Sequence, residues 1–454
     1  MRNTRHGVTT AGPDRSPLWL AGLVLTSVVV GLLGHASSAA ALTVEQIESR
    51  KGVKAWLVEE HSVPLVAIRF AFSGGAVQDQ RGKEGQTSIV SALLMEGAGE
   101  FSGPDFKERL SALGARLSTS SGRDALYGGL ETLKDRLTPS AELLRAMLAA
   151  PHFAPADIER VKAQRLTDLA ISANNPTRIA VEGWYAHAFP KHPYGRVVDG
   201  TPESIKRLTR EDLLDLHKYL FAKDALKIVV VGDIDKQAAV EMLDVIFGDL
   251  PASPRLARVT RTAPSFPGKP IIVDREFPLA TAAFGLASLP ADHPDYPALK
   301  VLNHIIGSGD FDSRLMDEIR VKRGLAYSIQ TTLDHDSITS LMLGTFATKN
   351  ETMNAALEVL KDVLARTARD GPTQEEFENA KRYLSGSFLL DFDTSGKVAS
   401  SLLGIWLDGE GPEALVARQE KIGKVTLGDV KRVARQILKV DKLIVTVVGR
   451  PKGP

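Results

Sequence analysis

The sequence predicts an α/β protein of the α+β type, built from two homologous halves that each contain a mixed β-sheet backed by helices. Two observations lead to this prediction. A capped helix, a short loop and an apolar strand, residues 208–233, return near the C-terminus as residues 425–450. In the first half, strand and hairpin signals come before this helix-to-strand unit, which favours a mixed sheet over an all-parallel one.

The repeat is set by matching positions. Thr209 and Thr426 lie 217 positions apart (426 − 209), and each is followed three residues later by an aspartate. That spacing is typical of a capping box, so both copies are expected to begin a helix in the same way. A weaker match of Asp157–Lys162 with Glu376–Lys381 lies at 219 positions (381 − 162), a difference that two inserted loop residues would absorb.

Periodicity predicts the other elements of the first half, because strands alternate apolar residues and helices repeat them every three or four positions. Glycine and proline mark most of the breaks between these elements. The predicted elements are strands at 53–59 and 64–72, helices at 84–94 and 104–113, a strand pair turning near 121–124, and helices at 141–149 and 156–170.

Composition excludes several classes of protein. The 454 residues are 43% hydrophobic and 24% charged, which fits neither a disordered chain nor a polytopic membrane protein. The 56 basic and 55 acidic side chains leave a formal charge of +1, so there is no electrostatic basis for binding nucleic acid. Cysteine is absent, which leaves His, Asp and Glu as the plausible metal ligands.

The first 41 residues are predicted to be a signal peptide or an N-terminal anchor. Basic residues precede an uncharged run at 18–34, and small residues at 37–41 offer cleavage sites. We expect export to the periplasm, with anchoring to the inner membrane if the segment is not cleaved. The predicted division is then a first half at 42–262, a linker at 263–270 and a second half at 271–454.

Residues 318–329 are predicted to join a helix to a strand. Apolar spacing over 314–322 is helical, Gly324 is typical of a helix end, and alternation from Leu325 predicts a strand. Arg320 and Tyr327 would then meet at a turn, where both could donate to one substrate carbonyl. The alternative is a surface arginine and a half-buried strand tyrosine.

Residues 307–327 resemble the glycine-rich loop, helix and Arg/Tyr motif of pitrilysin/insulinase-type zinc peptidases, the group that includes mitochondrial processing peptidase. Residues 74–85 resemble the loop before that family's metal helix, and residues 192–195 and 231–233 resemble later landmarks. The resemblance implies that each half is a mixed-sheet unit and that the two halves form one shell of a clam-like chamber.

The metal helix departs from that family. Where the family has His-x-x-Glu-His, this sequence has Ser88-Ile-Val-Ser91-Ala92, and serine and alanine cannot replace those ligands. Asp168 is the nearest carboxylate to the place of the family's third ligand, a glutamate, and is expected to be an ordinary helix residue. We therefore predict no metal and no cofactor in this chain.

The resemblance implies an arrangement seen in two-chain members, where one subunit has the metal motif and the other contributes Arg and Tyr in trans. Arg320 would bind a substrate main-chain carbonyl and Tyr327 would donate to the oxyanion. Gly307 and Gly309 would let the loop backbone approach the peptide closely. The alternative for this loop is an ordinary turn that caps the next helix.

The predicted function is therefore the non-metal subunit of a heteromeric periplasmic zinc metallopeptidase, inactive alone. Zinc is expected in a homologous partner that has His-x-x-Glu-His, and the expected substrate is a peptide or an unfolded protein. Two alternatives stay open. One is a catalytically silent peptide-binding or scaffold protein of the same fold, as a heterodimer or a homodimer, and the other is a self-sufficient peptidase with an unusual metal site.

Overall fold

The computed structural model describes residues 43–266, 268–335, 338–387 and 392–452. The predicted signal or anchor segment lies outside these residues. Of the helices in the described ranges, none combines the length and the hydropathy that crossing a bilayer requires.

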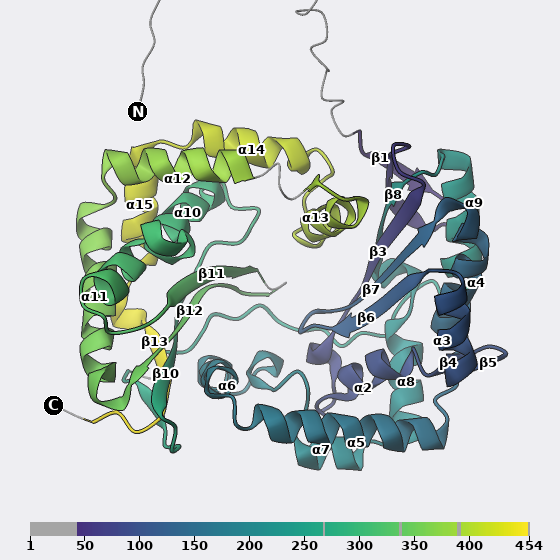
Figure 1. The fold of residues 1–454 in the computed structure, drawn as a ribbon, viewed down its shortest axis with the longest axis horizontal. Coiled ribbons are helices and arrows are strands. Elements are labelled where there is room, and N and C mark those ends of the chain that lie inside the picture. The colour runs from purple at the N-terminus through teal and green to yellow at the C-terminus, as the bar shows by residue number, and fades with distance from the viewer. Residues whose placement is uncertain (1–42, 267, 336–337, 388–391, 453–454) are drawn as a thin grey trace, which may run out of the picture. The chain divides into compact units, whose positions relative to one another are not determined.

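The first half contains a six-stranded mixed sheet with the order β1-β2-β8-β3-β7-β6 (Figure 1). β2 and β8 run parallel, and the other neighbouring strands are antiparallel. One face of this sheet packs against the helices of the same half to form a hydrophobic core. The strands are β1 (Glu45–Glu48), β2 (Lys54–Glu59), β3 (Leu65–Ser73), β6 (Arg116–Ser121), β7 (Ala125–Leu133) and β8 (Leu226–Gly232), with a small separate hairpin of β4 (Gly97–Ala98) and β5 (Phe101–Ser102).

The helices of the first half begin close to the predicted positions. The four helices predicted from periodicity correspond to the first four, and the predicted capped helix of the repeat corresponds to Arg210–Leu220. In its described residues the structure adds three others that the sequence pattern did not reveal. The helices of the first half are α2 (Gln86–Leu93), α3 (Gly103–Ala112), α4 (Leu137–Ala149), α5 (Pro155–Ser172), α6 (Pro176–Ala188), α7 (Pro202–Arg207), α8 (Arg210–Leu220) and α9 (Lys236–Phe247).

The second half repeats this plan with a five-stranded sheet, order β11-β12-β10-β13-β9, in which only β9 and β13 pair in parallel. Its hydrophobic core again lies between one sheet face and the helices of the same half. The predicted fold class, two mixed sheets backed by helices, is confirmed. The elements are β9 (Ile271–Val273), β10 (Leu279–Ala287), α10 (Tyr296–Asn303), β11 (Ile329–His335), β12 (Ser340–Lys349), α11 (Met353–Asp370), α12 (Gln374–Ser387), α13 (Ser395–Leu407), α14 (Ala414–Lys424), α15 (Leu427–Ile437) and β13 (Ile444–Val448).

Both predicted capping boxes are present. The Thr209 side chain accepts from the Asp212 amide at the start of α8, and the Asp212 carboxylate accepts from the Thr209 amide. The same reciprocal pair joins Thr426 and Asp429 at the start of α15. The repeat at 217 positions therefore extends to the bonds that begin the two helices.

A lysine that binds two backbone carbonyls also occurs in both halves. Lys162 Nζ donates to the carbonyls of Lys206 and Leu208 at 3.3 and 3.1 Å, just before the first capping box. Lys381 Nζ donates to the carbonyls of Gly423 and Val425 at 2.8 and 3.0 Å, just before the second. Each lysine thus connects its helix, α5 or α12, to the chain entering the capped helix.

The halves exchange one helix each. α6 belongs to the first half but packs on β10 and β13 of the second sheet, where Trp184 is fully buried and its indole N–H donates to the Ile444 carbonyl at 3.1 Å. α13 belongs to the second half but packs on β3 and β8, and Trp406 stacks on Trp56 with ring centroids 4.7 Å apart. The open face of each sheet is therefore covered by a helix from the other half (Figure 1).

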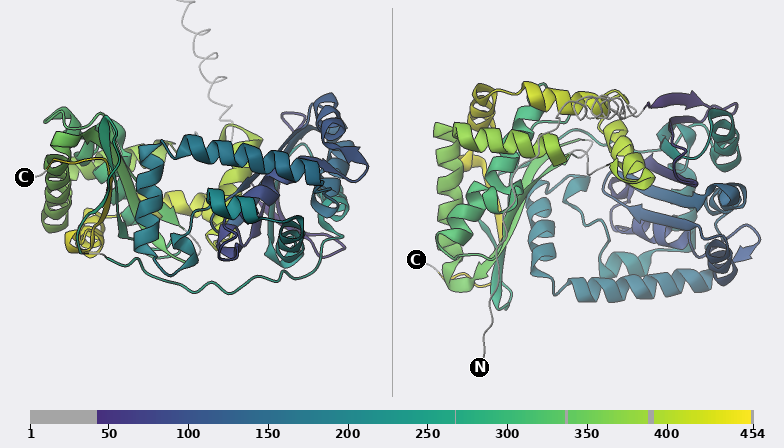
Figure 2. Two further views of the ribbon diagram at one scale, coloured as in Figure 1. Left: turned by 90° about the horizontal axis from the view of Figure 1, so that it is seen from below. Right: turned by 45° about the horizontal axis from the view of Figure 1, so that its top comes forward.

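The chain between α9 and β9 forms no helix or strand in its described part and runs as the teal trace along the lower edge of Figure 2, left. It is nevertheless attached to the first half. Gln78 and Ala257 exchange a pair of hydrogen bonds at 3.1 and 2.8 Å, and the Ser265 amide donates to the Ala188 carbonyl at 2.7 Å. The predicted linker at 263–270 falls within this segment, and the domain boundaries around it stay predictions.

Candidate functional site

The loop before Arg320 lies between two helix ends that are wound as π-helix. α10 continues into a π-helical turn, His304–Ser308, and the helix that starts at Arg314 ends as another, Met316–Val321. The Lys322 amide accordingly bonds to the Asp317 carbonyl, five residues back, at 2.9 Å. Single π-helical turns of this kind are frequent at functional sites.

Gly324 ends the Arg320 helix, as predicted, with φ at +60°. Its amide bonds to the Arg320 carbonyl at 2.9 Å, and the Leu325 amide bonds back to the Ile319 carbonyl at 2.8 Å. The Leu325 carbonyl accepts from the Thr348 hydroxyl.

The prediction that the strand begins at Leu325 is wrong, because the backbone groups of Leu325 close the helix end and bind a side chain instead of joining a strand ladder. β11 starts only at Ile329. Tyr327 consequently lies in the irregular segment between helix and strand, where its side chain is 81% exposed. This exposure and the later strand start also exclude the alternative that Tyr327 is a half-buried strand residue.

Arg320 and Tyr327 are brought together. The Arg320 guanidinium carbon lies 4.5 Å from the centroid of the Tyr327 ring and 4.5 Å from that of Phe311. Within the described ranges the guanidinium has no hydrogen-bond or ion-pair partner. A half-buried guanidinium with its N–H groups unpaired is ready to donate to an incoming acceptor.

Gly307 and Gly309 both lie where a larger residue would collide. A Cβ on Gly307 would stand 2.5 Å from the Thr331 hydroxyl of β11, and one on Gly309 would stand 2.7 Å from the His304 carbonyl. Gly307 is buried, so close packing of the π-helical turn against β11 is sufficient reason for glycine there. That either glycine contacts a substrate stays a prediction.

The alternative reading of this loop, a turn that caps the next helix with a side chain, does not hold for the described contacts. The Ser313 hydroxyl donates to the Asp310 carbonyl at 2.8 Å instead of accepting from the helix. Asp310 adopts a left-handed conformation with φ at +46°. A left-handed aspartate is uncommon and fixes the direction of the loop between the two π-helical turns.

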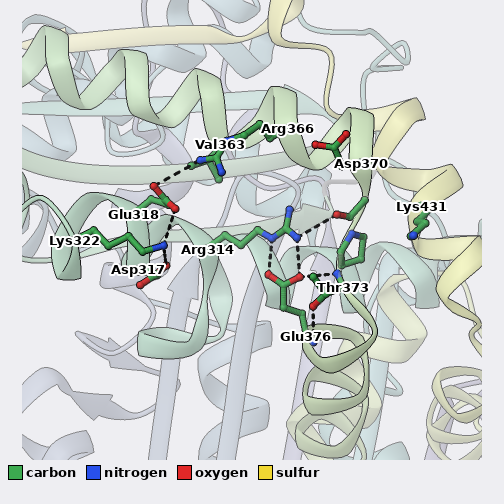
Figure 3. Close-up of a pocket in the computed structure, with 12 residues that line it drawn as sticks. Arg314, Asp317, Glu318, Lys322, Val363, Arg366, Asp370, Thr373, Glu376 and Lys431 are labelled. Carbon is green, nitrogen blue, oxygen red and sulfur yellow. Dashed lines mark hydrogen bonds and ion pairs between the residues drawn. The ribbon is translucent and has the colours of Figure 1, made fainter.

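The helix is held in place on its other side by ion pairs (Figure 3). Arg314 donates to both carboxylate oxygens of Glu376 in α12, at 2.6 and 2.7 Å, and to the Gly371 carbonyl at 3.1 Å. Burial alone would raise the pKa of Glu376, but the bonds from Arg314 outweigh it and the net pKa is lowered. Glu318 accepts from Lys322 at 2.9 Å and from Arg323.

These charged side chains line a cavity of about 440 Å³ between the Arg320 helix, α11 and α12. Most of them already form ion pairs with one another, as Figure 3 shows. We therefore read the cavity as the anchorage of the helix and not as a second site.

The first half places Ser88 on α2 in a charged network. Ser88 is buried, and its hydroxyl donates to Asp199 at 3.1 Å. Asp199 also accepts from Arg165 of α5 at 3.2 Å and from Arg178 of α6 at 3.0 Å. The carboxylate that accepts from Ser88 is therefore also bound by two permanently charged guanidinium groups.

Asp79 holds the start of α2. Its carboxylate accepts from the amides of Gly85 and Thr87 at 2.8 and 2.9 Å and from the Thr87 hydroxyl at 2.6 Å. Burial raises the pKa of Asp79 to about 7, against these donors and the nearby Arg196, which act in the opposite direction. Asp79 thus replaces the missing side-chain cap of the helix and is not available as a ligand.

The residues around α2 do not fit a zinc ion. Ser91 uses its carbonyl to accept from Thr119 at 2.9 Å, Ala92 has no donor atom, and Asp168 accepts from Gln164 at 2.9 Å. Two arginines around Asp199 would repel a dication placed beside them. Searched over the described part of the chain, no three His, Asp or Glu side chains come together as a metal-binding group.

Comparison with known proteins agrees with this geometry. Residues 54–201 match the profile of the insulinase family (peptidase family M16), and residues 207–384 match the profile described as the peptidase M16 inactive domain. The chain belongs to the insulinase family. The resemblance that the sequence motifs predicted is thereby confirmed. The second profile begins just before α8 of the first half and continues into α12 of the second half, so the two profiles do not mark the boundary between the halves.

Among relatives of this insulinase-family chain, a "non-peptidase homolog YmxG" from Helicobacter pylori is 25% identical over 94% of this chain and 98% of its own length. A probable mitochondrial-processing peptidase subunit beta from Schizosaccharomyces pombe is 26% identical over 87% of this chain and 89% of its own. The crystal structure of a peptidase M16 inactive domain from Pseudomonas fluorescens superimposes with a TM-score of 0.85, at 26% identity, over 91% of this chain and 98% of that one.

Sequence reasoning missed two parts of the site. Phe311 follows the glycine-rich loop without any periodic signal, so nothing indicated that it would contact Arg320. Asp199 lies in a turn between recognised landmarks, and its partners Arg165 and Arg178 come from two different helices. Only the packing of α2 against α5 reveals that network.

Proposed function

We propose that this insulinase-family chain is the non-metal subunit of a heteromeric periplasmic zinc peptidase and supplies Arg320 and Tyr327 in trans. The observation that best supports the proposal is the state of Arg320. Its guanidinium has no polar partner in the described structure, and it stands beside an exposed tyrosine. The ring contacts hold the side chain without using its N–H groups, and a peptide-binding residue needs such free donors.

In this proposal, the two residues act on the substrate in different ways. Arg320 donates to a main-chain carbonyl and orients the peptide, and Tyr327 donates to the oxygen that becomes negatively charged as the peptide bond is attacked. A single donor of this kind lowers the barrier by roughly 3 kcal/mol, or about 100-fold in rate. The zinc and the general base belong to a partner with His-x-x-Glu-His, because α2 of this chain has no ligands to offer.

The experiment is to isolate the tagged protein from its native envelope fraction, identify the proteins that accompany it and measure chelator-sensitive cleavage of labelled casein. We expect a His-x-x-Glu-His relative to co-purify, the complex to cleave and the isolated chain not to cleave. Metal-dependent hydrolysis by the isolated chain would refute the proposal.

Two variants then test the site. Tyr327→Phe should slow cleavage by about 100-fold while leaving assembly unchanged. Tyr383→Phe is a matched control, because Tyr383 is a comparably open tyrosine, 57% exposed, that stacks on His304 instead of Arg320. Equal effects of the two variants on cleavage would mean that Tyr327 has no special role.

A second candidate, a catalytically silent peptide-binding or scaffold protein, is favoured by one comparison. The Helicobacter pylori relative that matches almost the whole chain is described as a non-peptidase homolog. If no partner with the metal motif accompanies the protein but it still binds unfolded protein through Arg320, this second function replaces the first.

The proposed location rests on sequence alone. The basic start, the uncharged run at 18–34 and the small residues that follow are typical of an export signal. Mass spectrometry of the mature N-terminus tests it directly. A start near residue 42 supports cleavage and a periplasmic protein, and an intact N-terminus in the membrane fraction supports anchoring.

A further inference from the structure

The Arg320 side chain is flanked by two exposed aromatic rings. Phe311 and Tyr327 each lie 4.5 Å from the guanidinium carbon, and they are 60% and 81% exposed. The same guanidinium therefore contacts two large, exposed aromatic side chains.

This geometry has a consequence for the arginine. A free arginine side chain samples many rotamers, and ordering it on binding costs entropy. The two rings attract the guanidinium through their π-electrons, and this attraction does not use the N–H groups as hydrogen-bond donors to a protein acceptor. The donors are therefore oriented before any peptide arrives.

The position of Phe311 is itself built into the loop. Asp310, the residue before Phe311, adopts the left-handed conformation. The Ser313 hydroxyl donates to the Asp310 carbonyl at 2.8 Å and closes a turn that contains Phe311. The π-helical turns on either side fix the ends of the loop. Phe311 is therefore presented by a defined turn and not by a free loop tip.

We propose that Phe311 is a positioning residue that holds the Arg320 guanidinium beside Tyr327 with its N–H edge free for a main-chain carbonyl of an extended peptide. The inference rests on the part of the proposed function in which Arg320 binds peptide. It does not depend on zinc, on a partner or on catalysis.

The test measures binding by the isolated chain. The probe is fluorescein-labelled, reduced and carboxymethylated α-lactalbumin, an unfolded protein, and the readout is its anisotropy at a fixed salt concentration. Phe311→Ala should weaken binding by about threefold to fivefold, the effect of losing one exposed cation–π contact. Phe311→Tyr keeps the ring and should stay within about twofold of the wild type.

A double-mutant cycle separates positioning from a merely structural effect. If Phe311 acts through Arg320, then Phe311→Ala should have no further effect in an Arg320→Met background. Tyr383→Ala is the matched control, since it removes another exposed aromatic ring close to the loop, and it should leave binding unchanged.

Each outcome decides the question. Equal weakening by Phe311→Ala in both backgrounds, failure of Phe311→Tyr to restore binding, or no binding by the wild type would overturn the inference. The expected pattern without any chelator-sensitive cleavage by a native complex would leave the inference standing and refute the proposed catalytic role. If the complex cleaves but Phe311→Ala binds the probe as tightly as the wild type, the catalytic role is supported and the inference about Phe311 is overturned.

Discussion

The exchange of α6 and α13 predicts that the two halves unfold together. Trp184→Ala tests this, because Trp184 belongs to the first half but is completely buried on the second sheet. Truncating a buried tryptophan costs about 3–5 kcal/mol. The lost bond to the Ile444 carbonyl adds about 1 kcal/mol, so we expect a loss of about 4–6 kcal/mol in the free energy of unfolding.

Trp406→Ala is the reciprocal change on α13. Trp406 is only half-buried, and its main contact is the stack on Trp56, so a smaller loss of about 2 kcal/mol is expected. Ile171→Ala serves as the control, because Ile171 is 68% exposed on α5 and should change the stability by less than about 0.5 kcal/mol.

The assay is urea denaturation followed in parallel by circular dichroism and by tryptophan fluorescence. If each sheet depends on a helix from the other half, both signals should follow one transition in the wild type, and both variants should shift that transition as a whole. Separate transitions in the wild type, or a loss below about 1 kcal/mol for Trp184→Ala, would refute the reasoning.

Three further predictions concern the ends and anchors of helices. Folding lowers the pKa of Glu376, so this carboxylate stabilises the protein above the ordinary glutamate pKa, and the stabilisation is lost as the pH falls through the lowered pKa. Glu376→Gln should therefore lower the urea midpoint at neutral pH. It should also make the decrease in stability between about pH 5 and 3 smaller than in the wild type. Thr426→Ala should cost about 1 kcal/mol through loss of the capping box of α15, and no change in the thermal midpoint would contradict that bond. Combined Ser88→His, Ser91→Glu and Ala92→His should still give less than one zinc per chain after dialysis, measured by elemental analysis, because Asp199 beside Ser88 is bound by two arginines and the described residues bring no cluster of His, Asp or Glu together there.

The fold was predictable where local sequence determines local structure. The capping threonines, the helix stop at Gly324 and the alternating strands depend on neighbours within a few positions, and the repeat made the second half readable from the first. The strand start at Leu325 was wrong because a helix end and a threonine side chain compete for its backbone groups, which alternation cannot reveal. The exchange of α6 and α13 was equally hidden, since a helical pattern does not say which sheet it covers.

The candidate site likewise has parts that the sequence predicts and parts that only the structure reveals. The proximity of Arg320 and Tyr327 was predicted from the helix-to-strand pattern, and the absence of the His-x-x-Glu-His motif from its expected position was read from residues 88–92. The contact of Phe311 with Arg320 depends on a left-handed Asp310 and on two π-helical turns, which have no simple pattern in the sequence. The arginine network around Asp199 depends on three segments meeting in space.

The exchanged helices also have a consequence for how this architecture could arise. α6 and α13 occupy equivalent places in the repeat, 219 positions apart (395 − 176). α6 covers β10 and β13, and α13 covers the corresponding strands of the other sheet, β3 and β8. Two identical half-chains would adopt this arrangement by swapping one helix each, as a domain-swapped dimer does. Joining them through the segment between α9 and β9 replaces a concentration-dependent association with an intramolecular one. Once joined, the two copies are free to diverge, and one can lose its metal ligands while the other keeps its donors.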